Sequence, residues 1–169
     1  MDKLLYDILK QGIELKDGEP EYFSFDPWRT FTNPHDLITL TNKIHDVLSG
    51  KDYEVVAGVG DGGYVLASAF AVQHRTNLAY IPFPFYPWFG DKYCVKPRAG
   101  VKDKKVVVFS DMLTHGMSFY HATKTIDKSG GNISSLIVLM DLEWDDELAN
   151  QIRRRDDFTA LSRKSDFLK

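Results

Sequence analysis

The sequence predicts an α/β fold, in which residues 1–169 form a single domain with a mainly parallel sheet flanked by helices. Strand-like and helix-like segments alternate along the chain, which is typical of parallel crossovers. The strand-like runs are continuously apolar, as expected for strands covered by helices on both faces. With 169 residues, 43% of them hydrophobic, the chain has the size of one ordinary domain with a sizeable core.

The first confident element is a helix over residues 33–50. Asn33 can cap its start, Pro34 fits the first helical position, and Gly50 marks its end. Apolar residues recur at helical spacing on one side, namely Leu37, Leu40, Ile44, Val47 and Leu48.

Two strand–helix–strand units follow this helix. In the first, the expected elements are a strand over 54–60, a helix over 63–75 and a strand over 77–83. In the second, they are a strand over 104–110, a helix over 118–131 that ends at Gly130 and Gly131, and a strand over 133–141. A late helix is predicted over 143–155, with arginines near its C-terminal end, where the helix dipole favours cations.

Charge and composition exclude several classes of function. The net charge is −3 with acidic and basic residues mixed, and the one short basic cluster is Arg153, Arg154 and Arg155, so we expect neither nucleic-acid nor membrane binding. Cys94 is the single cysteine and cannot form an internal disulfide. The first residues lack the layout of a secretory signal, and no apolar run approaches a membrane span, so we expect a cytoplasmic protein.

A polar, glycine-centred turn follows the strand over 104–110. Ligands of parallel sheets bind beyond the carboxyl ends of the strands, where this turn is expected. Gly116 allows close approach of the backbone, and free N–H groups with the Thr114 and Ser118 hydroxyls can cradle a phosphate. Asp111 can accept hydrogen bonds from a ribose diol. The alternative is that Thr114 or Ser118 only caps the next helix.

Several segments resemble the type I phosphoribosyltransferases. "VVVFSDMLTHGMSF" resembles their signature for phosphoribosyl pyrophosphate (PRPP), and "GVGDGGYVLASAFA" is similar to their pyrophosphate loop. "ILKQGIELKDGEPEYFSFD" is similar to the N-terminus of orotate phosphoribosyltransferases. "LMDLEWDDELANQI" and "FTALSRKSDFLK" lie where that family has its Asp-Arg-x-Glu segment and final helix. The resemblance covers nearly the whole chain and implies that fold, with a small hood built from both ends.

The resemblance implies a role for each segment. It assigns the 5-phosphate of PRPP to Thr114, His115, Gly116, Met117 and Ser118, chiefly through their backbone amides. The two acids that bind the ribose correspond to Ser110 and Asp111, of which only Asp111 is acidic. It assigns pyrophosphate, together with Mg²⁺ bound with PRPP, to Gly60, Asp61, Gly62 and Gly63. Glycines between a strand and a helix can also serve close packing alone.

The base-binding and catalytic segments depart from the family. Lys16 and Phe25 are the expected base-binding residues, whereas Leu142 replaces the arginine that binds orotate. Prolines and aromatic residues over 81–100 replace a basic catalytic loop, so Lys96 and Arg98 (or Lys92), with Asp111, are the expected catalytic residues. The aromatic side chains there can form a dimer contact, a core flap or a stacking wall. The five histidines show no metal-ligand spacing, so no protein-held metal is expected.

Two functions remain open from the sequence. The first is transfer of phosphoribose from PRPP to a nucleobase with release of pyrophosphate, and the resemblance suggests orotate and hence pyrimidine synthesis. The missing arginine leaves an uncharged base open. The second is a non-catalytic homologue that binds PRPP or a nucleotide as a regulatory or structural protein, since one acid and the loop cations are absent. The resemblance also implies a homodimer.

Overall fold

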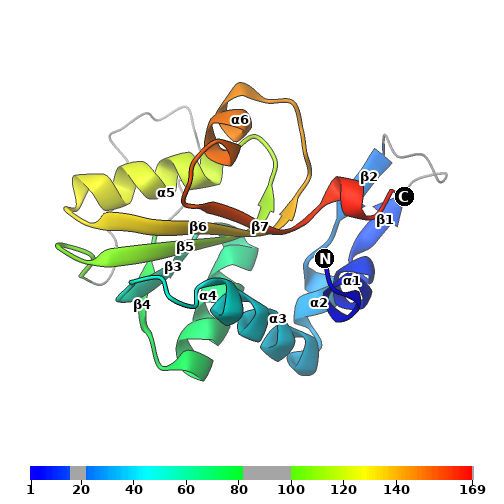
Figure 1. Ribbon diagram of the computed structural model, residues 1–169, viewed down its shortest axis with the longest axis horizontal. Coiled ribbons are helices and arrows are strands. Elements are labelled where there is room, and N and C mark those ends of the chain that lie inside the picture. The colour runs from blue at the N-terminus through cyan, green and yellow to red at the C-terminus, as the bar shows by residue number, and fades with distance from the viewer. Residues whose placement is uncertain (16–21, 82–99, 169) are drawn as a thin grey trace.

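The computed structural model describes residues 1–15, 22–81 and 100–168. Its centre is a five-stranded sheet in the order β4-β3-β5-β6-β7, and every neighbouring pair is parallel (Figure 1). The strands are β3 (Val55–Gly58), β4 (Asn77–Tyr80), β5 (Lys105–Leu113), β6 (Asn132–Asp141) and β7 (Phe158–Arg163). This architecture confirms the predicted α/β fold with a mainly parallel sheet.

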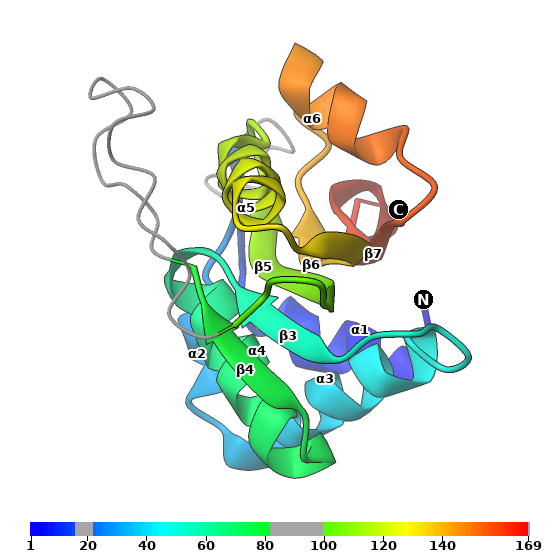
Figure 2. The same cartoon turned by 90° about the vertical axis from the view of Figure 1, so that its left-hand side faces the viewer.

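Helices cover both faces of the sheet. α3 (Pro34–Val47) and α4 (Gly60–His74) lie on one face, and α5 (Met117–Lys128) and α6 (Glu147–Arg153) lie on the other (Figures 1 and 2). Along β5, Val107 and Phe109 belong to the first core, whereas Val106 and Val108 belong to the second. The continuous apolar runs of the sequence therefore reflect strands that are buried on both faces.

Helix α3 forms for the reasons predicted. The Asn33 side chain caps its start by accepting a hydrogen bond of 3.1 Å from the His35 N–H, and Pro34 occupies the first position. Leu40 and Ile44 are buried against α4. The helix ends at Val47, and Gly50 follows with a φ of 77°, a conformation that glycine adopts at little cost.

A small hood lies beyond the carboxyl ends of the strands. It contains α1 (Lys3–Lys10), the antiparallel hairpin β1 (Ile13–Leu15) and β2 (Phe23–Phe25), and α2 (Trp28–Phe31). The short 3₁₀ helix η4 (Lys164–Asp166) joins it from the other end of the chain. The Phe167 ring then stacks on the Tyr6 ring with centroids 5.0 Å apart. The hood built from both ends is confirmed (Figure 1).

The expected final helix is wrong, because residues 158–163 form strand β7. β7 pairs with β6, and the buried Ser162 hydroxyl donates a hydrogen bond of 2.7 Å to the Leu139 carbonyl. The pairing satisfies backbone groups of β6 that would otherwise lie at an open sheet edge. Strand pairing with β6 therefore determines the conformation of residues 158–163.

Three boundaries also differ from the prediction. β5 continues to Leu113 because β6 pairs beside it as far as Asp141, so Ser110 and Asp111 lie within the strand. α4 begins at Gly60, so residues 60–63 form its first turn and not a loop. α6 begins at Glu147, because the Asp146 side chain accepts hydrogen bonds from the Leu148 and Ala149 N–H groups and caps it there.

Within the described ranges, no helix combines the length and the apolar character that crossing a bilayer requires.

Candidate functional site

A pocket of about 200 Å³ lies at the carboxyl end of β5 and is lined by the consecutive residues 112–119. These residues carry the chain from the strand into α5, whose N-cap is Gly116. The first N–H groups of a helix have no acceptor inside it, and Gly116 has no side chain to supply one. The pocket therefore combines free N–H donors with the positive end of a helix dipole, which suits an anion.

Gly116 is required at this turn for two reasons. Its φ is +80°, in the left-handed region that other residues rarely adopt. A Cβ at this position would also lie 3.1 Å from the Ala149 nitrogen and 3.2 Å from its Cα, at the start of α6. The helix is capped by Gly116, so the alternative that Thr114 or Ser118 serves only as its cap is wrong.

Asp111 lies beside this pocket, near the end of β5, with its carboxyl largely shielded from water. Its Oδ1 accepts a hydrogen bond of 2.9 Å from the Met112 N–H. Burial raises the pKa of Asp111, and the charge of the nearby Asp61 adds to that effect. A carboxylate held here at a cost is a candidate for binding a ligand that satisfies it.

Ser110, the other expected ribose-binding residue, is not presented to a ligand. It is 2% exposed, and its hydroxyl donates a hydrogen bond of 3.2 Å to the Met112 carbonyl. Because β5 continues past it, its side chain lies within the protein. The Ser110 side chain is therefore not available for the expected ribose contact, and Asp111 stays the predicted ribose-binding residue.

The first turn of α4 packs directly on the end of β5. A Cβ on Gly62 would overlap the Asp111 carboxylate, and one on Gly63 would lie 2.5 Å from the Phe109 carbonyl oxygen. Gly60 instead faces open space, with a φ of +72°. The close-packing interpretation thus holds for Gly62 and Gly63. The same packing places the expected pyrophosphate segment, with the exposed Asp61, beside the expected ribose acid.

Phe25 is the expected base-binding residue that lies within the described residues. Phe25 is 5% exposed and belongs to the core of the hood, where a Cβ on Gly12 would lie 2.7 Å from its ring. The assignment of Phe25 to base stacking is therefore corrected, because its ring is covered by protein. Lys16, Lys92, Lys96, Arg98 and the segment of prolines and aromatic residues lie outside the described residues.

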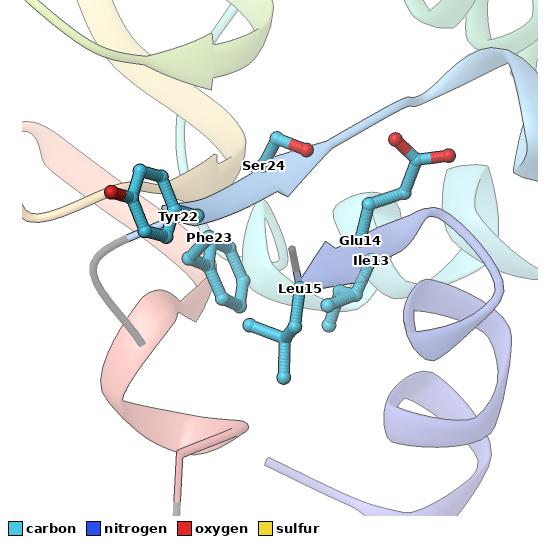
Figure 3. Close-up of a pocket in the computed structure, with 6 residues that line it drawn as sticks. All are labelled: Ile13, Glu14, Leu15, Tyr22, Phe23 and Ser24. Atoms are coloured by element: carbon cyan, nitrogen blue, oxygen red, sulfur yellow. The ribbon is translucent and has the colours of Figure 1, made fainter. Parts of the chain in front are cut away.

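A second pocket, of about 830 Å³, opens along the hood hairpin. Figure 3 shows that Glu14 and Ser24 point to one side of the hairpin, and Ile13 and Leu15 point to the other. The lining residues are Ile13, Glu14, Leu15, Tyr22, Phe23 and Ser24. Its polar side carries a carboxylate that forms an ion pair with Arg29.

Sequence reasoning missed an ion pair at the end of β6. Asp141 is 1% exposed, and Arg153 donates to it from Nε (2.9 Å to Oδ2) and from Nη2 (2.8 Å to Oδ1). This bonding raises the pKa of Arg153. The signal was available, because an acid at the end of a buried strand needs a partner, and Arg153, Arg154 and Arg155 follow it in the sequence.

The sequence also failed to indicate the surroundings of His115. Its Nδ1 lies 3.1 Å from Oδ2 of Asp146, and its ring meets the Trp144 ring edge-on with centroids 4.8 Å apart. Both partners follow β6, so the link crosses from one strand end to the next. No local pattern predicts such a contact.

The chain matches no family model. It is 27% identical to adenine phosphoribosyltransferase from Prochlorococcus marinus over 148 residues, which cover 80% of this chain and 81% of that protein. It is 28% identical to orotate phosphoribosyltransferase from Pyrobaculum aerophilum over 144 residues, which cover 83% and 74%. The chain is a homologue of the type I phosphoribosyltransferases.

The fold of this phosphoribosyltransferase homologue agrees with its sequence relatives. The crystal structure of orotate phosphoribosyltransferase from Aeropyrum pernix superposes with a TM-score of 0.76 at 18% identity, covering 98% of this chain and 96% of that one. The names of the relatives differ in the base, adenine or orotate. The comparisons therefore leave the base open.

Proposed function

We propose that the chain transfers phosphoribose from PRPP to a nucleobase and releases pyrophosphate. The observation that carries this proposal is the anion pocket of residues 112–119 at the start of α5, with Asp111 and the first turn of α4 packed beside it. PRPP carries a phosphate, a ribose and a pyrophosphate, so its binding needs a site for each of the three, side by side. The relationship to phosphoribosyltransferases supports the same assignment.

The chemistry is electrostatic in this proposal. The N–H groups at the start of α5 hold the 5-phosphate, and Asp111 accepts hydrogen bonds from the ribose hydroxyls. The first turn of α4 faces the departing pyrophosphate, where negative charge develops as the glycosidic bond breaks. The base nitrogen attacks the anomeric carbon, so no side-chain nucleophile is needed.

We propose that Mg²⁺ enters with PRPP. In the part of the chain that the structure describes, no group of three or more His, Cys, Asp or Glu side chains can hold a metal ion. Asp61 lies near enough to Asp111 for its charge to raise the pKa of Asp111, and the oxygens of both carboxylates suit Mg²⁺. Mg²⁺ is often bound by one or two carboxylates together with substrate phosphates, and these residues fit that arrangement.

The base in this proposal is uncharged. Leu142 stands where the orotate enzymes have an arginine and is 5% exposed. The Arg153 guanidinium is taken by Asp141, by the Trp144 carbonyl (2.9 Å) and by Asn150 Oδ1 (2.8 Å). Neither Leu142 nor Arg153 therefore offers an unpaired positive charge to a base that carries a carboxylate. Orotate remains the second candidate, favoured by the likeness of the N-terminal segment and by Lys16.

The test is pyrophosphate release from Mg²⁺-PRPP, with adenine, other purines, uracil and orotate supplied in turn. We expect release with one uncharged base, and its loss in Asp111→Asn. Release with orotate alone would overturn the choice of base. Thermal stabilisation by PRPP without release would instead favour the non-catalytic PRPP-binding homologue.

Three further expectations remain predictions: a single domain over 1–169, a homodimer and a cytoplasmic location. Light scattering of the purified chain at micromolar concentration checks the second. A mass of two chains is expected, and a single-chain mass at all concentrations would contradict it.

A further inference from the structure

Three side chains connect the rim of the anion pocket to the segment between β6 and α6. His115 belongs to the pocket lining, and its Nδ1 lies 3.1 Å from Oδ2 of Asp146. The Trp144 ring meets the imidazole edge-on at 4.8 Å between centroids. The imidazole is thus held in one direction by a carboxylate and in another by an indole.

Both partners are themselves fixed. The Asp146 carboxylate caps α6 by accepting from the Leu148 N–H (2.9 Å) and the Ala149 N–H (3.2 Å). The Trp144 carbonyl accepts a hydrogen bond of 2.9 Å from Arg153, whose guanidinium is bound to the buried Asp141. The position of His115 is therefore set by groups anchored at the start of α6 and at the end of β6.

The imidazole remains open to a ligand. The His115 side chain is 60% exposed, so the imidazole can be reached from solvent. An Nδ1–H that donates to a carboxylate leaves Nε2 as the atom that gains or loses the proton. When protonated, Nε2 becomes a charged donor at the rim of a pocket that suits an anion.

Charged side chains lie on one side of His115. The group that faces it is Asp146, whose own pKa is lowered by the Ala149 N–H and by His115. Asp145 and Glu147 flank Asp146 in the sequence, and Arg153 lies beyond Trp144 on the side of its carbonyl. Met117 and Ser118, which follow in α5, carry no charge.

We propose that Asp146 and Trp144 are positioning residues that hold His115 as a protonatable ligand of the bound phosphate monoester. The identity of this group as the 5-phosphate of PRPP rests on the proposed function. Bound phosphate then receives a charge-assisted hydrogen bond from the imidazolium in addition to the backbone donors of α5. Neutral His115 has no proton on Nε2 to donate to the phosphate, so affinity rises as the pH falls.

The experiment is calorimetric titration of the whole chain with ribose 5-phosphate at about pH 6 and about pH 8, which bracket histidine titration. The measured quantity is the ratio of the two affinities, compared among variants so that titration of the ligand itself cancels. We expect the wild-type ratio to exceed that of His115→Gln by about tenfold, as for one hydrogen bond to a charged group.

Asp146→Asn tests the positioning role, because asparagine still caps a helix but no longer carries the charge. We expect its ratio to fall toward that of His115→Gln, with little further loss in the double variant. Asp145→Asn is the matched control, since Asp145 accepts a hydrogen bond from Asn150 (3.1 Å) and should leave the ratio unchanged. Trp144→Leu should lower the ratio less than His115→Gln does.

Equal ratios in wild type and His115→Gln would overturn the inference, as would failure of ribose 5-phosphate to bind. The proposed function fails separately, when no base supports pyrophosphate release. A pH-dependent contribution of His115 without any release would therefore leave this inference standing and remove the function. Pyrophosphate release together with equal ratios in wild type and His115→Gln would support the proposed function and overturn this inference.

Discussion

Asp111 on β5 and Gly62 in the first turn of α4 lie so close together that a Cβ on residue 62 would overlap the Asp111 carboxylate. Asp111 can therefore occupy this position only because residue 62 has no side chain. It also joins two segments that are far apart in the sequence and that the resemblance assigns to different parts of one ligand.

Gly62→Ala should displace Asp111 or lift the start of α4 from the strand. We expect a loss of about 1–3 kcal/mol in the free energy of unfolding, as for overpacking of a close contact, and weaker binding of PRPP. Urea denaturation and PRPP titration measure the two effects. Gly100→Ala is the control, because a Cβ there meets nothing within 4 Å, and a comparable loss in that variant would refute the packing argument.

Asp111→Asn should weaken PRPP binding while leaving the free protein as stable or more stable at neutral pH. The pKa of Asp111 is raised in the fold, so above the unfolded value of 3.8 its ionisation opposes folding, increasingly so as the pH rises. Asparagine removes that cost and keeps an acceptor for the Met112 N–H. Thermal unfolding with and without PRPP distinguishes the effects, and a marked fall in the melting temperature of the free variant would contradict the prediction.

Arg153→Met should destabilise the fold by about 3 kcal/mol or more at neutral pH, because it strands the Asp141 carboxylate in the interior. Arg155→Met removes the more exposed pair with Asp157 and should cost less than about 1 kcal/mol. Chemical denaturation of both variants provides the comparison. Equal losses would show that burial of Asp141 does not control the effect.

Acidification should destabilise the contact between α3 and α4. The His45 and His74 rings stack with centroids 4.3 Å apart, and the buried Nε2 of His74 has no hydrogen-bond partner among the described residues. Burial, followed by the charge of His45, lowers the pKa of His74 below 6.5, although a hydrogen bond with the Thr41 backbone and the charge of Asp46 partly oppose this. Stability is therefore present above pH 6.5 and is lost as the pH falls below it.

His74→Phe keeps a ring in the stack and removes the titration, so its stability should vary less with pH in this range. Unfolding curves at several values between about pH 5 and 8 measure the slopes. An unchanged slope in the variant would assign the acid sensitivity to other groups.

The sequence predicted those parts of the molecule that depend on local pattern. Asn33 and Pro34 start α3, and the continuous apolar runs of β5 and β6 indicate strands buried on both faces. The turn at Gly116 was found for the same reason, because its polar residues and its glycine follow a strand directly. These signals lie within a few consecutive residues.

The sequence did not predict the features that depend on contacts between distant segments. The end of β5 is set by pairing with β6, which keeps Ser110 inside the sheet. Phe25 looked available for a base, yet the hood buries it. The partners of Arg153 and His115 come from different elements, and no spacing in the sequence reports them.

The hairpin β1–β2 forms a two-stranded sheet of its own, and among the described residues it shares no strand pairing with the five-stranded sheet. Its open pocket can therefore be redesigned, or exchanged for that of a relative, without breaking one hydrogen-bond ladder of the parallel sheet. The anion pocket, by contrast, is built into that sheet and its helices. A change in the hairpin pocket therefore leaves in place the strands and helices that form the anion pocket.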